Sequence, residues 1–104
     1  MNSSHKNAIK KFSKNTKKIL KDNLVDILVY GSVARGESNQ DSDVDIIVVV
    51  KRNAFRTQMR LAALSFDILM ETGEYLSVQT MKSKDLKRDT IFLHNVRRDS
   101  IHAL

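Results

Sequence analysis

The chain has 104 residues, and its 18 lysines and arginines against 12 acidic residues give a formal net charge of +6. It has no cysteine, which excludes disulfide scaffolds and thiolate metal sites. It contains neither a membrane-spanning apolar run nor the apolar core of a signal peptide, so we expect a soluble, cytoplasmic protein of one domain, residues 1–104, without membrane contact.

Hydrophobic periodicity predicts alternating helices and strands along the chain. Helices are expected where apolar residues recur at three- and four-residue spacing, and strands where β-branched residues run together or alternate with polar ones. The expected elements are a helix at 7–23, strands at 25–30 and 44–50, a helix at 54–72, a strand at 75–81, a short helix at 90–96 and a strand or tail at 100–104.

This order of elements predicts an α/β (α+β) fold with a small mixed β-sheet flanked by helices. The connection between the first two strands has room for a turn or a small helix but hardly for a full crossover. The run 44–50 is almost continuously apolar, which is typical of a strand buried on both faces.

The helix expected at 54–72 ends at Gly73, a residue suited to a helix C-cap. Met59, Phe66 and Met70 lie on one stripe of this helix. Such a stripe is far more often core packing than a cofactor site, so we expect these three side chains in the core.

Two carboxylates flank Val44 at the start of the second strand. Because strand side chains alternate, Asp43 and Asp45 project from the same face, where they repel each other unless one is protonated or a cation lies between them. A Mg²⁺ ion bound by oxygens would relieve this repulsion and keep positions open for phosphates. The alternative is a strand at a sheet edge that carries two solvated acids.

The first strand runs directly into Gly31 and Ser32. Glycine at this place permits a tight turn and a close backbone approach to a ligand. Exposed N–H groups and the Ser32 hydroxyl can hold phosphate oxygens. Taken alone, such a turn is weak evidence, but a short connection would set it beside Asp43 and Asp45.

The stretch "GSVARGESNQDSDVD" resembles the Gly-Ser, spacer, Asp-x-Asp signature of the DNA polymerase β-like nucleotidyltransferase superfamily. The longer stretch "YGSVARGESNQDSDVDIIVVV" is similar to the minimal nucleotidyltransferases. The resemblance implies the polymerase β-like fold and implies that Gly31 and Ser32 bind the triphosphate of ATP or another nucleoside triphosphate. It further implies that Asp43 and Asp45 are catalytic and coordinate Mg²⁺.

Arg35 also belongs to the resembling motif and is counted with the nucleotide-binding residues. It either positions phosphates or pairs with Glu37 or Asp41, and the sequence leaves both open. Ser42 is expected to orient the loop before Asp43.

The sequence departs from the superfamily pattern in one respect. Active members usually carry a third carboxylate on a following strand, and here that strand offers Ser77 or Gln79. Asp67 would be a candidate only if its segment were a strand, and the helical period argues against this. Metal and nucleotide binding are therefore better supported than turnover.

The resemblance also implies a partner, because minimal nucleotidyltransferases are often paired with a HEPN protein as antitoxin and toxin and can add AMP to it. The leading hypothesis is such an AMP transfer to an acceptor hydroxyl. The alternatives are an inactive binding module that acts as an antitoxin by contact, a basic RNA-binding domain and a transferase for small molecules.

Seven lysines precede the first acidic residue, within residues 6–21. They are either the solvated face of a helix or a surface that contacts a partner protein, nucleic acid or tRNA. His5, His94 and His102 show no ligand spacing and are expected to be structural or solvated.

Overall fold

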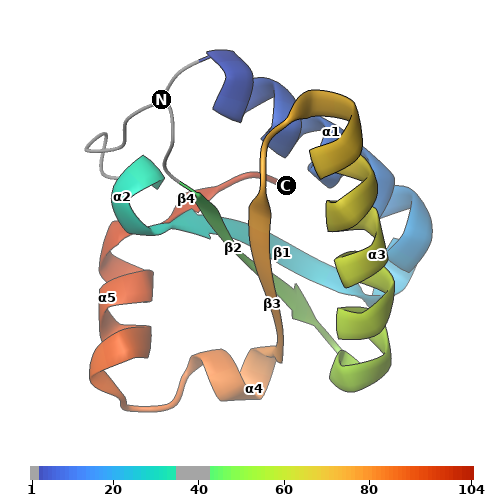
Figure 1. Ribbon diagram of the computed structural model, residues 1–104. Coiled ribbons are helices and arrows are strands. Elements are labelled where there is room, and N and C mark those ends of the chain that lie inside the picture. Colours follow the sequence, from blue (N-terminus) through green and yellow to red (C-terminus); the bar gives the residue numbers. More distant parts are fainter. Residues whose placement is uncertain (1–2, 35–42) are drawn as a thin grey trace.

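The computed structural model describes residues 3–34 and 43–104 (Figure 1). The elements in chain order are α1 (Ser3–Leu20), a 3-10 turn η1 (Lys21–Asn23), β1 (Leu24–Tyr30), α2 (Gly31–Ala34), β2 (Val44–Val50), α3 (Ala54–Thr72), β3 (Leu76–Lys82), α4 (Ser83–Leu86), α5 (Ile91–Asp99) and β4 (Ile101–His102).

The four strands form one mixed sheet in the order β3-β2-β1-β4. β1 runs antiparallel to both β2 and β4, whereas β2 and β3 are parallel. The short β1–β2 connection holds a small helix, α2, as its length allowed, and α3 makes the crossover that a parallel pair requires. The predicted mixed sheet with flanking helices is confirmed.

Helices cover both faces of the sheet (Figure 1). α1 and α3 pack on one face, where Phe12 and Leu61 join Ile46 and other strand residues in the larger core cluster. On the opposite face, Val96 of α5 packs with Ile47 in a smaller cluster, and α4 lies at its margin. β2 is accordingly buried from Ile46 to Val50 on both faces, as predicted.

The prediction that one apolar stripe of α3 lies in the core is wrong. Met59, Phe66 and Met70 are largely exposed, and the buried side of the helix carries smaller residues instead. The buried residues of α3 are Thr57, Leu61, Ser65 and Ile68. The helical period is correct, but the helix is turned so that its bulkier stripe faces away from the sheet. The bounds of α3 match the prediction, and Gly73 caps its end at φ +79 by donating its N–H to the Leu69 carbonyl at 2.8 Å.

The outer edge of β3 is occupied by a side chain. The Gln58 amide donates to the Val78 carbonyl at 2.9 Å, and its oxygen accepts from the Thr80 N–H at 2.7 Å. These are the two kinds of bond that a neighbouring strand would make, so Gln58 closes the middle of this edge.

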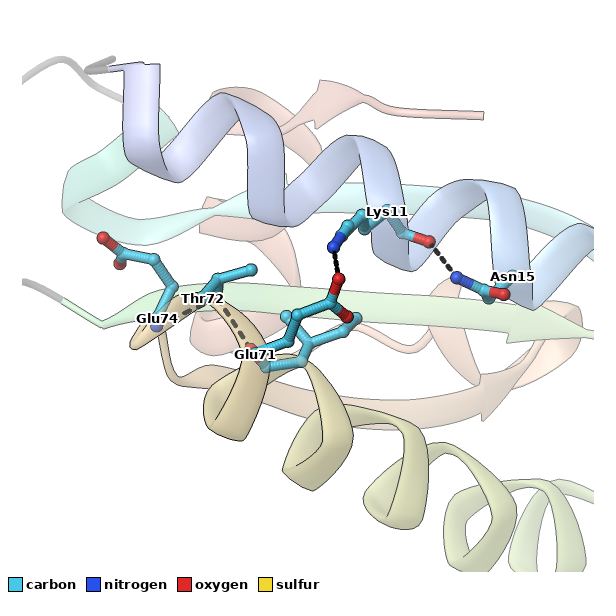
Figure 2. A network of polar contacts seen from close by, with 6 residues as sticks. Lys11, Asn15, Glu71, Thr72 and Glu74 are labelled. Atoms are coloured by element: carbon cyan, nitrogen blue, oxygen red, sulfur yellow. Dashed lines mark hydrogen bonds and ion pairs between the residues drawn. The ribbon is translucent and has the colours of Figure 1, made fainter.

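α1 is held by partners far along the chain. Ser13 donates its hydroxyl to the Ala103 carbonyl at 2.7 Å, and Lys11 forms an ion pair with Glu71 near the end of α3 (Figure 2). At the start of the helix, Nε2 of the buried His5 lies 3.4 Å from Oε2 of Glu74. The Glu74 carboxylate also accepts a hydrogen bond from the Ser4 hydroxyl. His5 therefore has the structural position expected for it.

The remaining differences from the sequence-based elements concern bounds. α1 begins four residues earlier than expected, and α5 extends to Asp99. α4 was not predicted, because four residues are too few to show a period. Among the helices of the described ranges, none combines the length and the apolar character needed to cross a membrane.

Candidate functional site

The two carboxylates at the start of β2 lie on the face of the sheet that α5 covers. Val44 is fully buried under α1 and α3, while Asp43 is exposed and Asp45 is partly buried. In the sheet, Asp45 lies opposite Tyr30 of β1, and the neighbouring Ile47 belongs to the cluster with Val96. The side-chain alternation of a buried strand therefore places Asp43 and Asp45 on one face, as predicted.

Gly31 lies directly against Asp45. It begins α2 with φ +78, a conformation that L-residues rarely adopt, and a Cβ on it would lie 2.5 Å from Oδ2 of Asp45. A residue with a side chain would therefore both strain the backbone and displace the carboxylate. The turn after β1 and the carboxylates of β2 come together as the short connection suggested.

The electrostatics of the pair favour added positive charge. The pKa of Asp45 is raised above its ordinary value, first because burial disfavours the charged carboxylate and second because Asp43 repels it. Burial also raises the pKa of the Tyr30 phenol, with a further contribution from the negative charge of Asp45. A divalent cation bound between the carboxylates would offset both the burial and the repulsion.

A small aromatic hollow adjoins Gly31. Its volume is about 190 Å³, and Tyr30 forms part of its wall with an edge-on contact to Phe92, whose ring centre lies 5.7 Å away. The residues lining it are Tyr30, Gly31, Phe92, Asn95, Val96 and Asp99. The sequence does not reveal this neighbourhood, since nothing in the spacing of α5 signals that Phe92 and Asp99 return to the end of β1.

Ser77 is the strand neighbour of Asp45, and it is one of the two positions, with Gln79, at which the resemblance leads us to expect a third carboxylate. In the parallel β2–β3 ladder Asp45 pairs with Ser77, and Gln79 pairs with Ile47 two residues further on. Asp67 lies on the exposed side of α3, away from the sheet, as its helical period predicted. Within residues 3–34 and 43–104, no group of three or more His, Cys, Asp or Glu side chains is arranged to hold a metal ion.

Two other acids are engaged elsewhere: Glu71 pairs with Lys11, and Glu74 pairs with Ser4 and His5. Ser32 lies within α2, beside Gly31. Arg35 and Ser42 lie outside the described residues, so their expected roles stay predictions.

The lysines of α1 lie away from the carboxylates. Lys6, Lys10, Lys14 and Lys17 are exposed and border a hollow of about 560 Å³ between α1 and β4, whose apolar residues include Ile9 and Ile101. The structure is thus consistent with the solvated helix face, and contact with a partner or with nucleic acid stays a prediction. His94 and His102 are exposed, and His102 pairs with Asp26 across the β1–β4 edge at 2.6 Å.

Relatives in Methanocaldococcus jannaschii share part of this sequence. The chain is 46% identical over 43 residues to "Putative protein adenylyltransferase MJ0141", an alignment covering 41% of this chain and 43% of the relative. It is 39% identical over 70 residues to "Putative protein adenylyltransferase MJ1379", covering 65% of this chain and 62% of the relative. The aligned chain thus spans less than two thirds of either relative.

A solved structure and the sequence profile of a domain family are also similar to this chain. The structure superposes on a chain of a toxin–antitoxin solved with AMP-PNP with a TM-score of 0.61, at 14% identity, covering 91% of this chain and 72% of that chain. That likeness shows the fold. The sequence profile of the nucleotidyltransferase domain matches residues 9–98, which include β1, β2 and both carboxylates. The chain belongs to the nucleotidyltransferase domain family.

Proposed function

We propose that this chain is a Mg²⁺-dependent nucleotidyltransferase that transfers AMP from ATP to a hydroxyl of a HEPN-type partner toxin in the cytoplasm. The observation that carries the proposal is the contact between Gly31 and Asp45, with Asp43 on the same face of the sheet. Membership of the nucleotidyltransferase domain family and the names of the two relatives support it.

Asp43 and Asp45 suit a hard cation, because two carboxylates on one face repel each other and leave the pKa of Asp45 raised. They would hold Mg²⁺, which when bound would supply positive charge to offset the negative charge that develops during transfer. Gly31 and Ser32 would receive the triphosphate, with Arg35 as a further phosphate contact. Because Gly31 has no Cβ, the Asp45 carboxylate can occupy its present position beside it.

In the reaction, the acceptor hydroxyl oxygen forms a bond to the α-phosphorus of ATP. The bond between that phosphorus and the oxygen bridging to the β-phosphorus breaks, so pyrophosphate leaves and the hydroxyl proton is released. What the chain contributes is mainly position, because phosphoryl transfer depends on holding the nucleotide and the acceptor in line.

The proposed acceptor is a partner protein for two reasons. Two relatives are named protein adenylyltransferases, and a chain of similar fold was solved as part of a toxin–antitoxin.

A second candidate function is that of a non-catalytic antitoxin that binds nucleotide and acts by contact. The observation that favours it is that Asp45 pairs with Ser77 and not with an acidic residue on β3. The two candidates share the nucleotide site and differ only in turnover.

Calorimetric titration of ATP and Mg²⁺ tests the shared site. The Asp43→Asn and Asp45→Asn double variant is expected to lose Mg²⁺-dependent ATP binding while remaining folded. A matched control is the double variant Asp22→Asn with Asp89→Asn, which removes two exposed acids elsewhere and should bind as the wild type does. Unaltered ATP affinity in the folded Asp43/Asp45 variant would contradict the site.

Incubation of the wild-type chain with a purified HEPN-type toxin and ATP labelled at the α-phosphate separates the two functions. Label on the toxin, with stoichiometric pyrophosphate, supports the transferase. A stable complex that binds ATP but transfers no label supports the contact antitoxin.

A further inference from the structure

One strip of the side of α3 that faces away from the sheet is apolar. Phe55 is 83% exposed, Met59 64%, Phe66 61% and Met70 70%. With Ala62 and Ala63 between them, they form one continuous strip, here called the α3 outer face. A contiguous exposed apolar strip of this kind marks an interaction surface. We propose that the α3 outer face binds a second copy of this chain, with the two α3 helices antiparallel about a twofold axis.

The order of residues on the α3 outer face is symmetric about its centre. Phe55 and Met70 lie equally far from the midpoint between Ala62 and Ala63, and so do Met59 and Phe66. In an antiparallel pair crossing at that midpoint, each phenylalanine therefore meets a methionine of the second copy. Thioether sulfur against an aromatic ring is a favourable contact, and the alanines at the crossing permit a close helix–helix approach.

A charged strip beside the α3 outer face has matching symmetry. Arg56 and Arg60 lie in the first half of α3, and Asp67 and Glu71 in the second half. An antiparallel twofold places the basic half of each helix beside the acidic half of the other, so every pair forms twice. In a parallel twofold pair the two charged strips would lie on opposite sides of the interface and could not pair with each other.

This order of charges is the reverse of what a single helix prefers. Acidic residues stabilise the start of a helix and basic residues its end, but α3 has no acid in its first turn and no base in its last turn. A second, antiparallel helix alongside α3 would explain this order of charges, because the basic half of each helix would then pair with the acidic half of the other.

The participating charges are available for such contacts. Across the described part of the chain, Arg56, Arg60 and Asp67 take part in none of the ion pairs found. Glu71 already pairs with Lys11 (Figure 2). Its side chain nevertheless remains largely exposed, so it can receive a second cation. The clearest intermolecular pair is therefore Arg60 with Asp67.

The other obvious route to association, edge-to-edge sheet pairing at β3, is disfavoured because Gln58 occupies the Val78 carbonyl and the Thr80 N–H. The strip from Phe55 to Met70 is about 22 Å long, and one helix pair buries less than the ~1,600 Å² of a standard interface. A reversible dimer in the micromolar range is therefore expected.

Charge reversal tests the proposed pairing by sedimentation equilibrium over roughly 1–500 µM chain. Arg60→Asp and Asp67→Arg are each expected to weaken the dimer at least about tenfold, because each sets two like-charge pairs across the axis. Mixing the two variants should restore association as a heterodimer, since Asp at 60 then meets Arg at 67 in both places. Ile91→Glu, at an exposed apolar position on α5, is the control that should dimerise as wild type.

Disulfide cross-linking tests the relative direction of the two helices. Because the chain has no cysteine, an introduced cysteine can pair only with its copy in the second chain. Ala63→Cys, near the axis, should form a disulfide dimer on mild oxidation, whereas Met70→Cys should not, because the two copies of residue 70 lie far apart. A wild-type chain that is monomeric over the whole range overturns the proposal, as does efficient cross-linking of Met70→Cys. If the α3 outer face binds a different protein instead of a second copy, the wild-type chain alone will be monomeric in sedimentation equilibrium. Neither assay needs ATP, so failure here is separate from failure of the proposed transferase.

Discussion

The carboxylate of Asp45 occupies the space beside Gly31 that a Cβ would fill, with Oδ2 2.5 Å from that position. The backbone of Gly31 is in the left-handed region at φ +78. Gly73, at the end of α3, has almost the same dihedral, φ +79, but no atom within 4 Å of its Cβ position. Substitutions at these two glycines therefore distinguish the effect of backbone strain from the effect of crowding at the candidate site.

Alanine at each of these glycines should cost a similar amount of stability. Both Gly31→Ala and Gly73→Ala are expected to lose about 1–2 kcal/mol in urea unfolding, the cost of a left-handed L-residue. Only Gly31→Ala is expected to lose Mg²⁺-dependent ATP binding, because its methyl group forces the Asp45 side chain to turn away. Equal ATP affinity in the two variants would contradict this.

The raised pKa of Asp45 predicts how stability depends on pH when no divalent cation is present. The folded protein holds the Asp45 proton more tightly than the unfolded chain does. Stability should therefore fall as pH rises from the ordinary aspartate pKa through the raised one, and this loss should be absent in Asp45→Asn. Melting curves in EDTA from pH 3 to 7 measure it, and the variant is expected to melt above the wild type at neutral pH. A variant that melts below wild type at neutral pH would show that the charge is stabilised.

A third carboxylate introduced beside Asp45 should couple stability to metal. Ser77→Asp places an acid next to Asp45 in the β2–β3 ladder, so repulsion should lower the melting temperature in EDTA. With Mg²⁺ present the same variant should gain more stability than wild type does, because three carboxylates bind the cation more tightly. Gln79→Asp, paired with Ile47, is the matched control and should not show the larger gain.

Removing the Gln58 amide should destabilise the sheet edge. Gln58→Leu keeps the size of the side chain but leaves the Val78 carbonyl and the Thr80 N–H without that partner, which is expected to cost about 1–3 kcal/mol in urea unfolding. Gln58→Glu keeps the acceptor for the Thr80 N–H but turns a carboxylate oxygen toward the Val78 carbonyl oxygen, so it should also destabilise the edge, and more so when the carboxyl group is ionised. Equal stability of wild type and Gln58→Leu would mean that water replaces both bonds.

Local sequence determined most of the fold. The bounds of β1 and β2 were predicted to within one residue, because continuous runs of β-branched residues favour buried strands in a small domain. The end of α3 was predicted because Gly73 is needed for a left-handed cap. The pairing of Asp43 with Asp45 on one face followed from strand alternation alone.

The features that were missed depend on packing between distant segments. Periodicity reveals that α3 has an apolar stripe, but Leu61 and Ile68 compete with Phe66 and Met70 for the sheet, and the sequence does not say which stripe wins. Likewise Phe92 reaches Tyr30 only because α5 returns across the sheet, 62 residues later in numbering.

The attachments of α1 have a consequence for synthesis. Ser4 bonds to Glu74 and Ser13 to Ala103, partners separated from them by 70 and 90 residues. At translation rates of about 5–20 residues per second, the second of these partners is made roughly 5–18 s after its serine. In the first part of that interval, before β1, β2 and α3 are complete, the apolar side of α1, with Ile9 and Phe12, has no core to pack against, which makes it the segment of the nascent chain that chaperones should meet first.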